Sequence, residues 1–587
     1  MTNQLQSVIK PVIIGMIISL SVTFANGQKV AASTAAQHFN RGIALLGKDN
    51  IKAALEEFQT AIRLNPRYGE AYNAMGLALA RKGDLKLAIE SFNKAIEIDP
   101  KGYKTHCNLG RAFLQLGDLD HAIAAFRQSI SLKPDDADAR VMLGAALQQI
   151  GQNDAAFAEY REAARLNPDL ADARFYLGYM MAARGQLREA TAEFEATVRL
   201  KPDYGEAYYY LGTARWFSDD VKGAILALRT AVKQMPGHAD SRYYLGLALR
   251  KNGDPQGAIT ELSTAARLAP EMAEPRYVMG QILRENEDLD EAIEALRAVI
   301  KLKPGFVQAY NELGLALVSK RDPEGAIAVF NDALRIEPNN LIAHHNLGMA
   351  FIQKSDYAAA VIEYQKLIAL APESSEAHYN LGLALKNKDQ FAEAIGELKK
   401  AIALQPSLQE AHYTLGVIFL QQSNLDEAAA SFRAALAARP DYAEAQYALG
   451  TVLQQQGKTD EAIAAFREAL KYAPNAPEIH NTLGTTLRQK GDMESARVEF
   501  QEAARLNRKK SDMQAAMFAT NTGLAQLKEG NIDAALERFE AAIKLDPTSA
   551  QAHYNLARAL KQKGQHAAAR IAYQKALRLN PRLKPLQ

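Results

Sequence analysis

The chain has almost no cysteine and no excess of either charge. Cys107 is the only cysteine among 587 residues, so an intrachain disulfide and a cysteine-based zinc site are both excluded. The 69 lysines and arginines nearly balance the 67 aspartates and glutamates. This balance gives no reason to expect nucleic acid or an anionic membrane surface as the partner.

Motifs of catalysis and cofactor binding are also missing. The sequence contains no glycine-rich phosphate loop, no nucleophile elbow and no HExxH pattern. Zinc ligands must converge to ~2 Å from one ion, whereas packed helices lie ~8–10 Å apart. We therefore interpret the histidines that recur at one position of the repeat described below as packing residues: His38, His106, His344, His378, His412, His480 and His553. We expect no enzyme activity, no metal and no cofactor.

Only one long apolar run occurs, and it lies near the start of the chain. Lys10 precedes a largely apolar stretch of 14 residues from Val12 to Ala25, and Thr23-Phe24-Ala25 ends this stretch in a small-x-small pattern. This run is shorter than the ~20 residues of a bilayer span. We predict a signal peptide over residues 1–34, or alternatively an uncleaved membrane anchor that tethers the chain through residues 11–28. In both cases the rest of the chain lies outside the cytoplasm, in the periplasm or secreted.

Proline, in contrast, is present at a fixed interval. It recurs every 34 residues from Pro66 to Pro474, and Pro547 and Pro581 resume the interval. Such a period indicates one small unit copied many times. The units are fourteen over residues 35–510 and two over 516–583, separated by an insertion or possible hinge at 511–515 and followed by a tail at 584–587. A stack of units offers a long surface, which favours binding over chemistry.

Each unit carries the pattern of two helices. In the unit 375–408, apolar and small residues recur three and four apart, which predicts helices at about 376–387 and 391–404. Glycine separates the two helices in nine units and suits a left-handed turn. Position eight is glycine in fifteen units and position twenty is alanine in all sixteen, so the two helices pack closely. The large residue at position twenty-four, such as Phe58 or Phe92, fills the space between units.

This combination of residues resembles the tetratricopeptide repeat (TPR) family over residues 35–583. The resemblance implies an all-α fold, an α-solenoid (right-handed superhelix) of 16 TPR helix-turn-helix hairpins, with a concave groove lined by the first helices. Segments such as AHYNLGLAL (377–385) also look like the repeat array of O-linked N-acetylglucosamine transferases. No catalytic domain follows the last unit in this sequence, so we expect no transferase activity from it.

Two sets of groove residues are candidate peptide-binding positions. Side-chain amides at position six can both donate to and accept from an extended peptide backbone, a role that the resemblance to the transferase arrays supports; they are Asn40, Asn108, Asn346, Asn380, Asn521 and Asn555. Aromatic residues, which dominate binding hot spots, gather in the middle units: Tyr176, Tyr179, Tyr209, Tyr210, Tyr243, Tyr244 and Trp216. The alternative is that these aromatics only cover neighbouring helices, and that Trp216 fills a gap left by Arg215 at a position that is normally leucine.

Two further features bear on the partner and on the organisation of the array. Position two is mainly acidic, as at Glu206 and Glu274, and position five has no lysine; this argues against capture of a C-terminal carboxylate. The acidic row favours basic peptides or simply improves the helix N-termini. Arg508 replaces the periodic proline before the insertion, so either the second helix runs longer there or the array bends.

The sequence thus predicts a non-enzymatic scaffold, exported from the cytoplasm, that binds partner proteins or extended peptides in its groove, for cell-envelope assembly or secretion. The alternative is a targeting array for a separate glycosyltransferase or polysaccharide-export subunit. A third interpretation is a structural spacer without a specific ligand. The oligomeric state is left open.

Overall fold

The computed structural model describes residues 34–581, 583, 585 and 586. The predicted signal peptide or anchor lies outside these residues, apart from Thr34. Among the helices that are described, none combines the length and the apolar character that a bilayer span requires.

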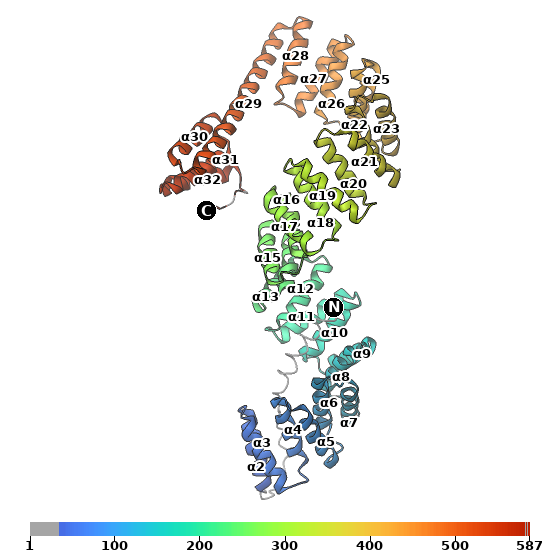
Figure 1. The fold of residues 1–587 in the computed structure, drawn as a ribbon, viewed down its shortest axis with the longest axis vertical. Helices are drawn as coiled ribbons and strands as arrows, with labels where there is room; N and C mark the ends of the chain where they lie inside the picture. Colours follow the sequence, from blue (N-terminus) through green and yellow to red (C-terminus); the bar gives the residue numbers. More distant parts are fainter. Residues whose placement is uncertain (1–33, 582, 584, 587) are drawn as a thin grey trace. The chain divides into compact units, whose positions relative to one another are not determined.

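The described residues form 31 helices and no strand, and the chain divides into two compact units between Ile282 and Leu283. Up to this boundary the helices are α2 (Thr34–Gly47), α3 (Ile51–Leu64), α4 (Gly69–Lys82), α5 (Leu85–Ile98), α6 (Tyr103–Leu116), α7 (Leu119–Leu132), α8 (Ala137–Gln149), α9 (Asn153–Leu166), α10 (Ala171–Ala183), α11 (Leu187–Leu200), α12 (Gly205–Phe217), α13 (Val221–Gln234), α14 (Ala239–Lys251) and α15 (Pro255–Leu268), with α16 (Glu274–Glu285) containing the boundary. The second unit continues with α17 (Leu289–Leu302), α18 (Val307–Ser319), α19 (Pro323–Ile336), α20 (Leu341–Gln353), α21 (Tyr357–Leu370), α22 (Ser375–Asn387), α23 (Phe391–Leu404), α24 (Gln409–Gln421), α25 (Leu425–Ala438), α26 (Ala443–Gln455), α27 (Thr459–Tyr472), α28 (Pro477–Lys490), α29 (Met493–Lys528), α30 (Ile532–Leu545), α31 (Ala550–Gln562) and α32 (His566–Leu579). Figure 1 shows them as successive antiparallel pairs.

The predicted hairpin is confirmed in detail. The unit 375–408 folds as α22 and α23, and both helices begin and end within one residue of the expected bounds. The turn between the two helices of each hairpin contains a residue in the left-handed region. Nine of these residues are the predicted glycines, and in the other seven hairpins a non-glycine residue takes a φ between 58° and 66°. The seven are Asp49, Asp219, Glu287, Arg321, Ser355, Asp389 and Ser423. The geometry of the turn is therefore set by the hairpin and not by glycine alone.

The core is built from the small and large positions of the repeat. A Cβ added to Gly450 would lie 2.6 Å from the ring of Phe466, and one added to Gly42 would lie 2.5 Å from Phe58. Position twenty is buried in all sixteen hairpins, with Ala54 and Ala394 fully inaccessible. Glycine at position eight therefore makes room for the large side chain at position twenty-four.

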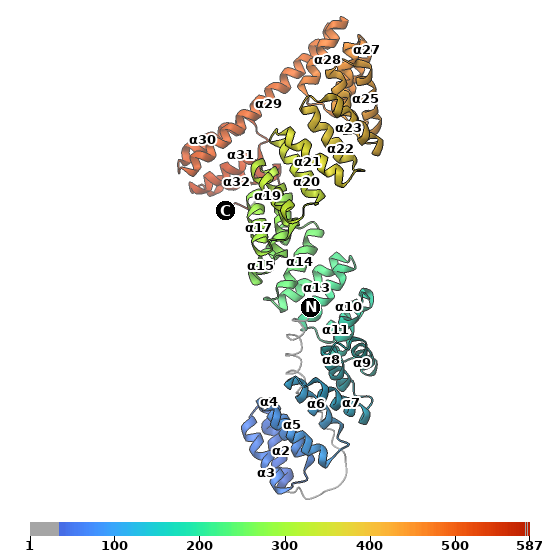
Figure 2. The ribbon, with the colours of Figure 1, turned by 45° about the vertical axis from the view of Figure 1, so that its right-hand side comes forward.

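The segment 511–515 is helical throughout. It lies within α29, a single helix of 36 residues that serves as the second helix of the fourteenth repeat and the first helix of the fifteenth. Figures 1 and 2 show α29 running without interruption between α28 and α30. The physical reason is local: Arg508 keeps the backbone N–H that proline lacks, and its neighbours Lys509 and Lys510 are good helix formers. Of the two alternatives for this segment, the structure shows the longer helix, whereas the possible hinge and the division into arrays of fourteen and two repeats stay predictions.

Candidate functional site

An aromatic network joins three consecutive repeats of the first compact unit. Helices α10, α12 and α14 are the first helices of these repeats, and each contacts the next. The ring of Phe175 lies 5.7 Å from that of Tyr210, Tyr179 meets Tyr210 edge-on at 5.3 Å, and Tyr209 lies 6.2 Å from Tyr244. The structure therefore brings the six predicted tyrosines into one connected cluster, completed by Tyr176 beside Phe175 and Tyr243 beside Tyr244.

The tyrosines of this cluster are not equally accessible. Tyr176 is only 5% exposed, because its ring stacks on Tyr160 of the preceding repeat at 5.1 Å. Tyr179, Tyr209, Tyr210, Tyr243 and Tyr244 are half-buried. Burial raises the pKa of Tyr243 to about 12, with smaller contributions from Tyr244 and Glu274. Tyr176 therefore belongs mainly to the core, whereas Tyr243 keeps its proton at neutral pH and can donate a hydrogen bond.

Trp216 lies at the edge of the same region. Its side chain is half-buried against the apolar cluster around Leu245, and the Lys251 ammonium lies 5.5 Å from the ring centroid. Arg215 is held by Glu195 at 2.7 Å and donates to the Gly223 carbonyl at 3.2 Å. Next to them, Phe217 is 61% exposed. Arg215 is thus anchored by its own hydrogen bonds, and Trp216 packs on the helix pair that follows.

Two buried polar atoms without partners lie beside the network. Asp172 precedes Phe175 and Tyr176 by one helical turn and is 8% exposed, and its Oδ1 accepts no hydrogen bond. The hydroxyl of Tyr204, whose ring lies 4.8 Å from Phe175, is also buried without a partner. An unsatisfied buried polar group costs ~1–3 kcal/mol. Buried polar atoms without partners are uncommon in native proteins, and a bound water, ion or ligand is one way in which such atoms gain a partner.

Charge at this edge is dominated by carboxylates. Burial raises the pKa of the Asp172 carboxyl, which Lys201 partly offsets, and burial likewise raises that of Glu206. The Lys201 ammonium lies 4.5 Å from the ring centroid of Tyr204. Sequence reasoning named Glu206 in the acidic row but missed Asp172 and Tyr204. The shared second position of Asp172 and Glu206 was the signal that could have found the first of them.

The six asparagines at position six do not form one uniform surface row. Asn40 and Asn521 are exposed, while Asn346 and Asn555 are 6% and 0% exposed. The half-buried Asn108 donates from Nδ2 to Asn73 Oδ1 at 3.0 Å, and Asn380 is also half-buried. The exposure of the asparagine at position six thus differs from one repeat to the next.

The histidines at position four connect elements within the array. His344 Nδ1 lies 2.8 Å from Glu363 Oε2, and its Nε2 lies 2.9 Å from the carbonyl oxygen of Pro338. His378 repeats both contacts, with Glu397 and with Pro372. Within the described part of the chain, no three metal-ligating side chains converge. These contacts fit the packing interpretation, because they tie the first helix of a repeat to its second helix and to the preceding proline.

A stack of helical hairpins in which each hairpin packs on the next defines a helical-repeat protein. The chain belongs to the tetratricopeptide repeat family. The family model described as Tetratricopeptide repeat matches residues 39–103, 142–205, 277–340, 385–443, 447–513 and 520–583, together more than half of the chain. A second model, TPR repeat, matches 110–151 and 348–389, and the model for Anaphase-promoting complex, cyclosome, subunit 3 matches 218–299.

Several solved structures resemble the chain. MamA 41-end from Desulfovibrio magneticus RS-1 is 25% identical, covering 29% of this chain and 96% of its own, with a TM-score of 0.28. Yeast Tom70 is 18% identical over 72% of this chain and 96% of its own, with a TM-score of 0.30. The APC/C hetero-tetramer Cut9-Hcn1 is 14% identical over 90% of this chain and 97% of its own, with a TM-score of 0.31. No curated protein matches this chain.

Proposed function

We propose that this chain is a non-enzymatic scaffold that binds a segment of a partner protein across α10, α12 and α14. TPR proteins generally bind proteins or peptides, and the proposal assigns that role to one face. The observation that carries it is the aromatic network bordered by the unpartnered atoms of Asp172 and Tyr204. Tyrosines offer large contact area at low entropic cost, and the two buried atoms offer hydrogen bonds that the free chain leaves unused.

The charge of the site favours a partner segment with lysine or arginine beside apolar residues. The carboxylates of the buried Asp172 and the half-buried Glu206 are costly to ionise, and a cation that contacts them removes part of that cost. The same cation would lie among tyrosine rings, whose faces attract positive charge. Lys201 over the ring of Tyr204 illustrates this contact within the chain itself.

The site of action that we propose is outside the cytoplasm, in cell-envelope assembly or secretion. Support comes from the sequence of residues 1–34, where Lys10 precedes the apolar run Val12–Ala25. An adaptor for a separate glycosyltransferase or polysaccharide-export subunit is the second candidate, favoured by the asparagine-bearing first helices. Affinity purification from the native envelope fraction separates the two, because only the adaptor retains a catalytic or pore subunit.

The binding face is tested by changing Tyr209, Tyr210, Tyr243 and Tyr244 to alanine. The probes are two labelled peptides of identical apolar sequence, one with lysines and one with glutamates. We expect saturable binding of the lysine peptide and a loss of at least ~30-fold in affinity for the variant. The control variant changes the position-five tyrosines of three repeats in the second compact unit. These are Tyr379, Tyr413 and Tyr447, and the variant should retain affinity. Unchanged binding by the first variant would remove this face from the proposal.

The carboxylates add a pH dependence whose sign follows from their raised pKa values. Because folding raises the pKa of Asp172 and Glu206 above 3.8 and 4.5, their ionised forms accumulate only as the pH rises through that raised range. Affinity for the lysine peptide should therefore increase with pH and level off once the pH exceeds the raised pKa values. Stability should change in the opposite sense, rising as the pH falls through the folded pKa values. Asp172→Asn should flatten the binding profile measured by fluorescence titration.

A further inference from the structure

The fourteenth repeat has the burial pattern of a repeat that ends an array. Position twenty-four is at most 1% exposed in every hairpin except two, in which Phe500 and Tyr573 are only half-buried. Tyr573 belongs to the sixteenth repeat, the last one in this sequence. Phe500 lies on the first half of α29, where the following repeat should cover it. Ala504, four residues further on, is exposed as well.

The fifteenth repeat has the burial pattern of a repeat that begins an array. Positions three and ten of the first helix are buried in fourteen hairpins. They are exposed in the first repeat, at Gln37 and Ala44, and in the fifteenth, at Phe518 and Ala525. Phe518 is 74% exposed at a position where the residue is usually a fully buried alanine. The second half of α29 thus lacks the preceding helix that its repeat requires.

The two uncovered surfaces lie on one side of the same straight helix. Phe500 and Phe518 are eighteen residues apart, which is five turns at ~3.6 residues per turn. Ala504 and Phe518 are separated by ~21 Å at ~1.5 Å per residue. Within one chain these surfaces cannot meet, because α29 holds them apart along its axis (Figure 2).

Regular repeat junctions show that the two surfaces are complementary. Tyr160 stacks on Tyr176 and Phe194 on Tyr210, so position twenty-four contacts position six of the next repeat. Position twenty-eight packs against the cluster that holds position three of the next repeat: Leu334 packs on the cluster of Val307, Ala333 and Ala343. In that regular junction the residue at position twenty-eight is large and the residue at position three is small. On α29 the sizes are reversed, because Ala504 occupies position twenty-eight and Phe518 occupies position three.

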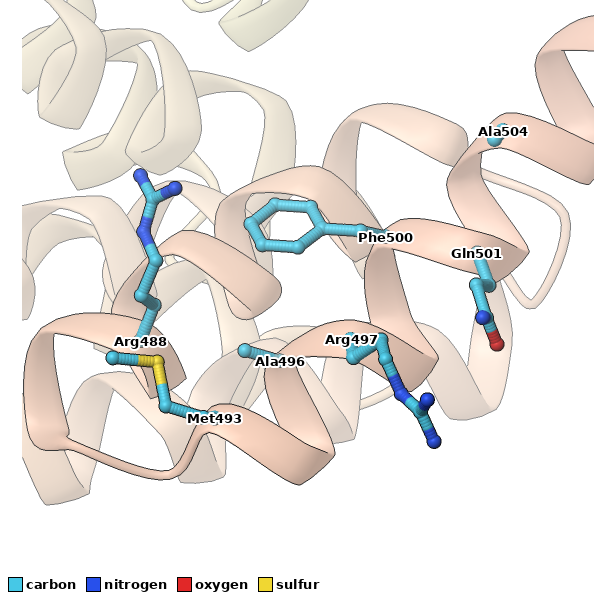
Figure 3. Close-up of a pocket in the computed structure, with 7 residues that line it drawn as sticks. All are labelled: Arg488, Met493, Ala496, Arg497, Phe500, Gln501 and Ala504. Carbon is cyan, nitrogen blue, oxygen red and sulfur yellow. The ribbon is translucent and has the colours of Figure 1, made fainter.

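A hollow is present where a large side chain would enter. It has a volume of about 420 Å³ and is lined by Met493, Ala496, Phe500 and Ala504, with Arg488 above the ring of Phe500 at 5.6 Å. Figure 3 shows Arg497 pointing away from that ring. The hollow is therefore mainly apolar and open on the side where the next first helix normally packs.

We propose that this hollow binds Phe518 from a second copy of the chain, so that two α29 helices pair antiparallel about a two-fold axis near Ser511. In this pairing Phe500 faces Asn521 of the other copy, and Ala504 faces its Phe518, which reproduces both contacts of a regular junction. The fourteenth repeat of one copy is then followed by the fifteenth and sixteenth repeats of the other. This is an isologous exchange of identical elements, in which every contact occurs twice.

The first test measures the mass of the full chain by sedimentation velocity. We expect a dimer, and Phe518→Glu should raise its dissociation constant at least ~tenfold, because a charge would enter the apolar hollow. Val498→Glu is the matched control: Val498 lies on the same helix and is 55% exposed, at a position that faces away from the neighbouring repeat. Circular dichroism should show equal helix content in both variants. A monomeric wild type, or a dimer unaffected by Phe518→Glu, would overturn the proposal.

The second test probes the two-fold axis directly. A cysteine at position 511 would lie opposite its own copy, so Ser511→Cys should give a covalent dimer on a non-reducing gel after mild oxidation. The native Cys107 should not interfere, because burial raises the pKa of its thiol to about 11. Val498→Cys, on the other side of α29, should not cross-link. Equal cross-linking of the two variants would contradict the antiparallel pairing.

Discussion

The junction between α27 and α28 and the middle of α29 occupy equivalent places in consecutive repeats, yet they differ completely. At the first, α27 ends at Tyr472, Pro474 follows, and α28 begins at Pro477. At the second, Arg508 takes the place of the proline and the helix continues to Lys528. The same backbone thus either turns back to cover the preceding helix or runs straight on.

The consequence for packing is seen at position twenty-four. Phe466 is 0% exposed because α28 covers it, whereas Phe500 is only half-buried because α28 contacts it from its own repeat but no following first helix packs on it. Burial of an identical phenylalanine therefore depends on the turn that follows it some eight residues later. In a repeat protein, the core of one unit is completed by its neighbour, so one changed turn leaves two repeats incomplete.

The largest difference is expected when the two phenylalanines are truncated. Phe466→Ala should cost ~3–5 kcal/mol, since it empties a fully covered site. Phe500→Ala should cost clearly less within a single chain, because part of its ring already contacts solvent. Chemical denaturation at low protein concentration, followed by hydrogen exchange in α27 and α29, measures both. Equal losses would show that Phe500 is covered in solution.

A smaller effect follows from restoring a proline. Arg508→Pro removes one helical hydrogen bond and should cost ~3 kcal/mol if α29 stays straight. The alternative response is that the helix ends before residue 508 and the fifteenth repeat folds back onto the fourteenth. Far-UV circular dichroism and protease cleavage between 507 and 515 distinguish the two. Pro474→Ala serves as the reciprocal change at the regular junction and should leave α27 and α28 separate.

The smallest effect concerns the glycines that face the two rings. A Cβ at Gly450 would lie 2.6 Å from Phe466, and one at Gly484 would lie 3.0 Å from Phe500. Gly450→Ala should therefore cost ~1–3 kcal/mol through overpacking. Gly484→Ala should cost less, since the ring of Phe500 has room to move. Thermal unfolding of the two variants gives the difference, and a larger loss for Gly484→Ala would contradict the open site.

Much of this architecture could be predicted from the sequence, because the repeat is dictated locally. The interval of the prolines, Gly382 at position eight and Ala394 at position twenty specified the hairpin of α22 and α23 to within one residue. The tyrosine positions on consecutive first helices also predicted that aromatic residues gather in the middle repeats, where the rings of Tyr209 and Tyr244 lie 6.2 Å apart. Asp172 and Tyr204 were missed, because an atom without a hydrogen-bond partner is defined by everything packed around it.

The sequence by itself determined the period, the hairpin and the family, since helix periodicity and the residues at the turns act over a few positions. Only the tertiary structure decided which side chains are covered. Asn40 and Asn555 occupy the same position of their repeats, yet one is exposed and the other fully buried. The physical reason is that burial of a side chain depends on the neighbouring repeat. At α29 the helix continues without a turn, so the fifteenth repeat does not fold back over Phe500.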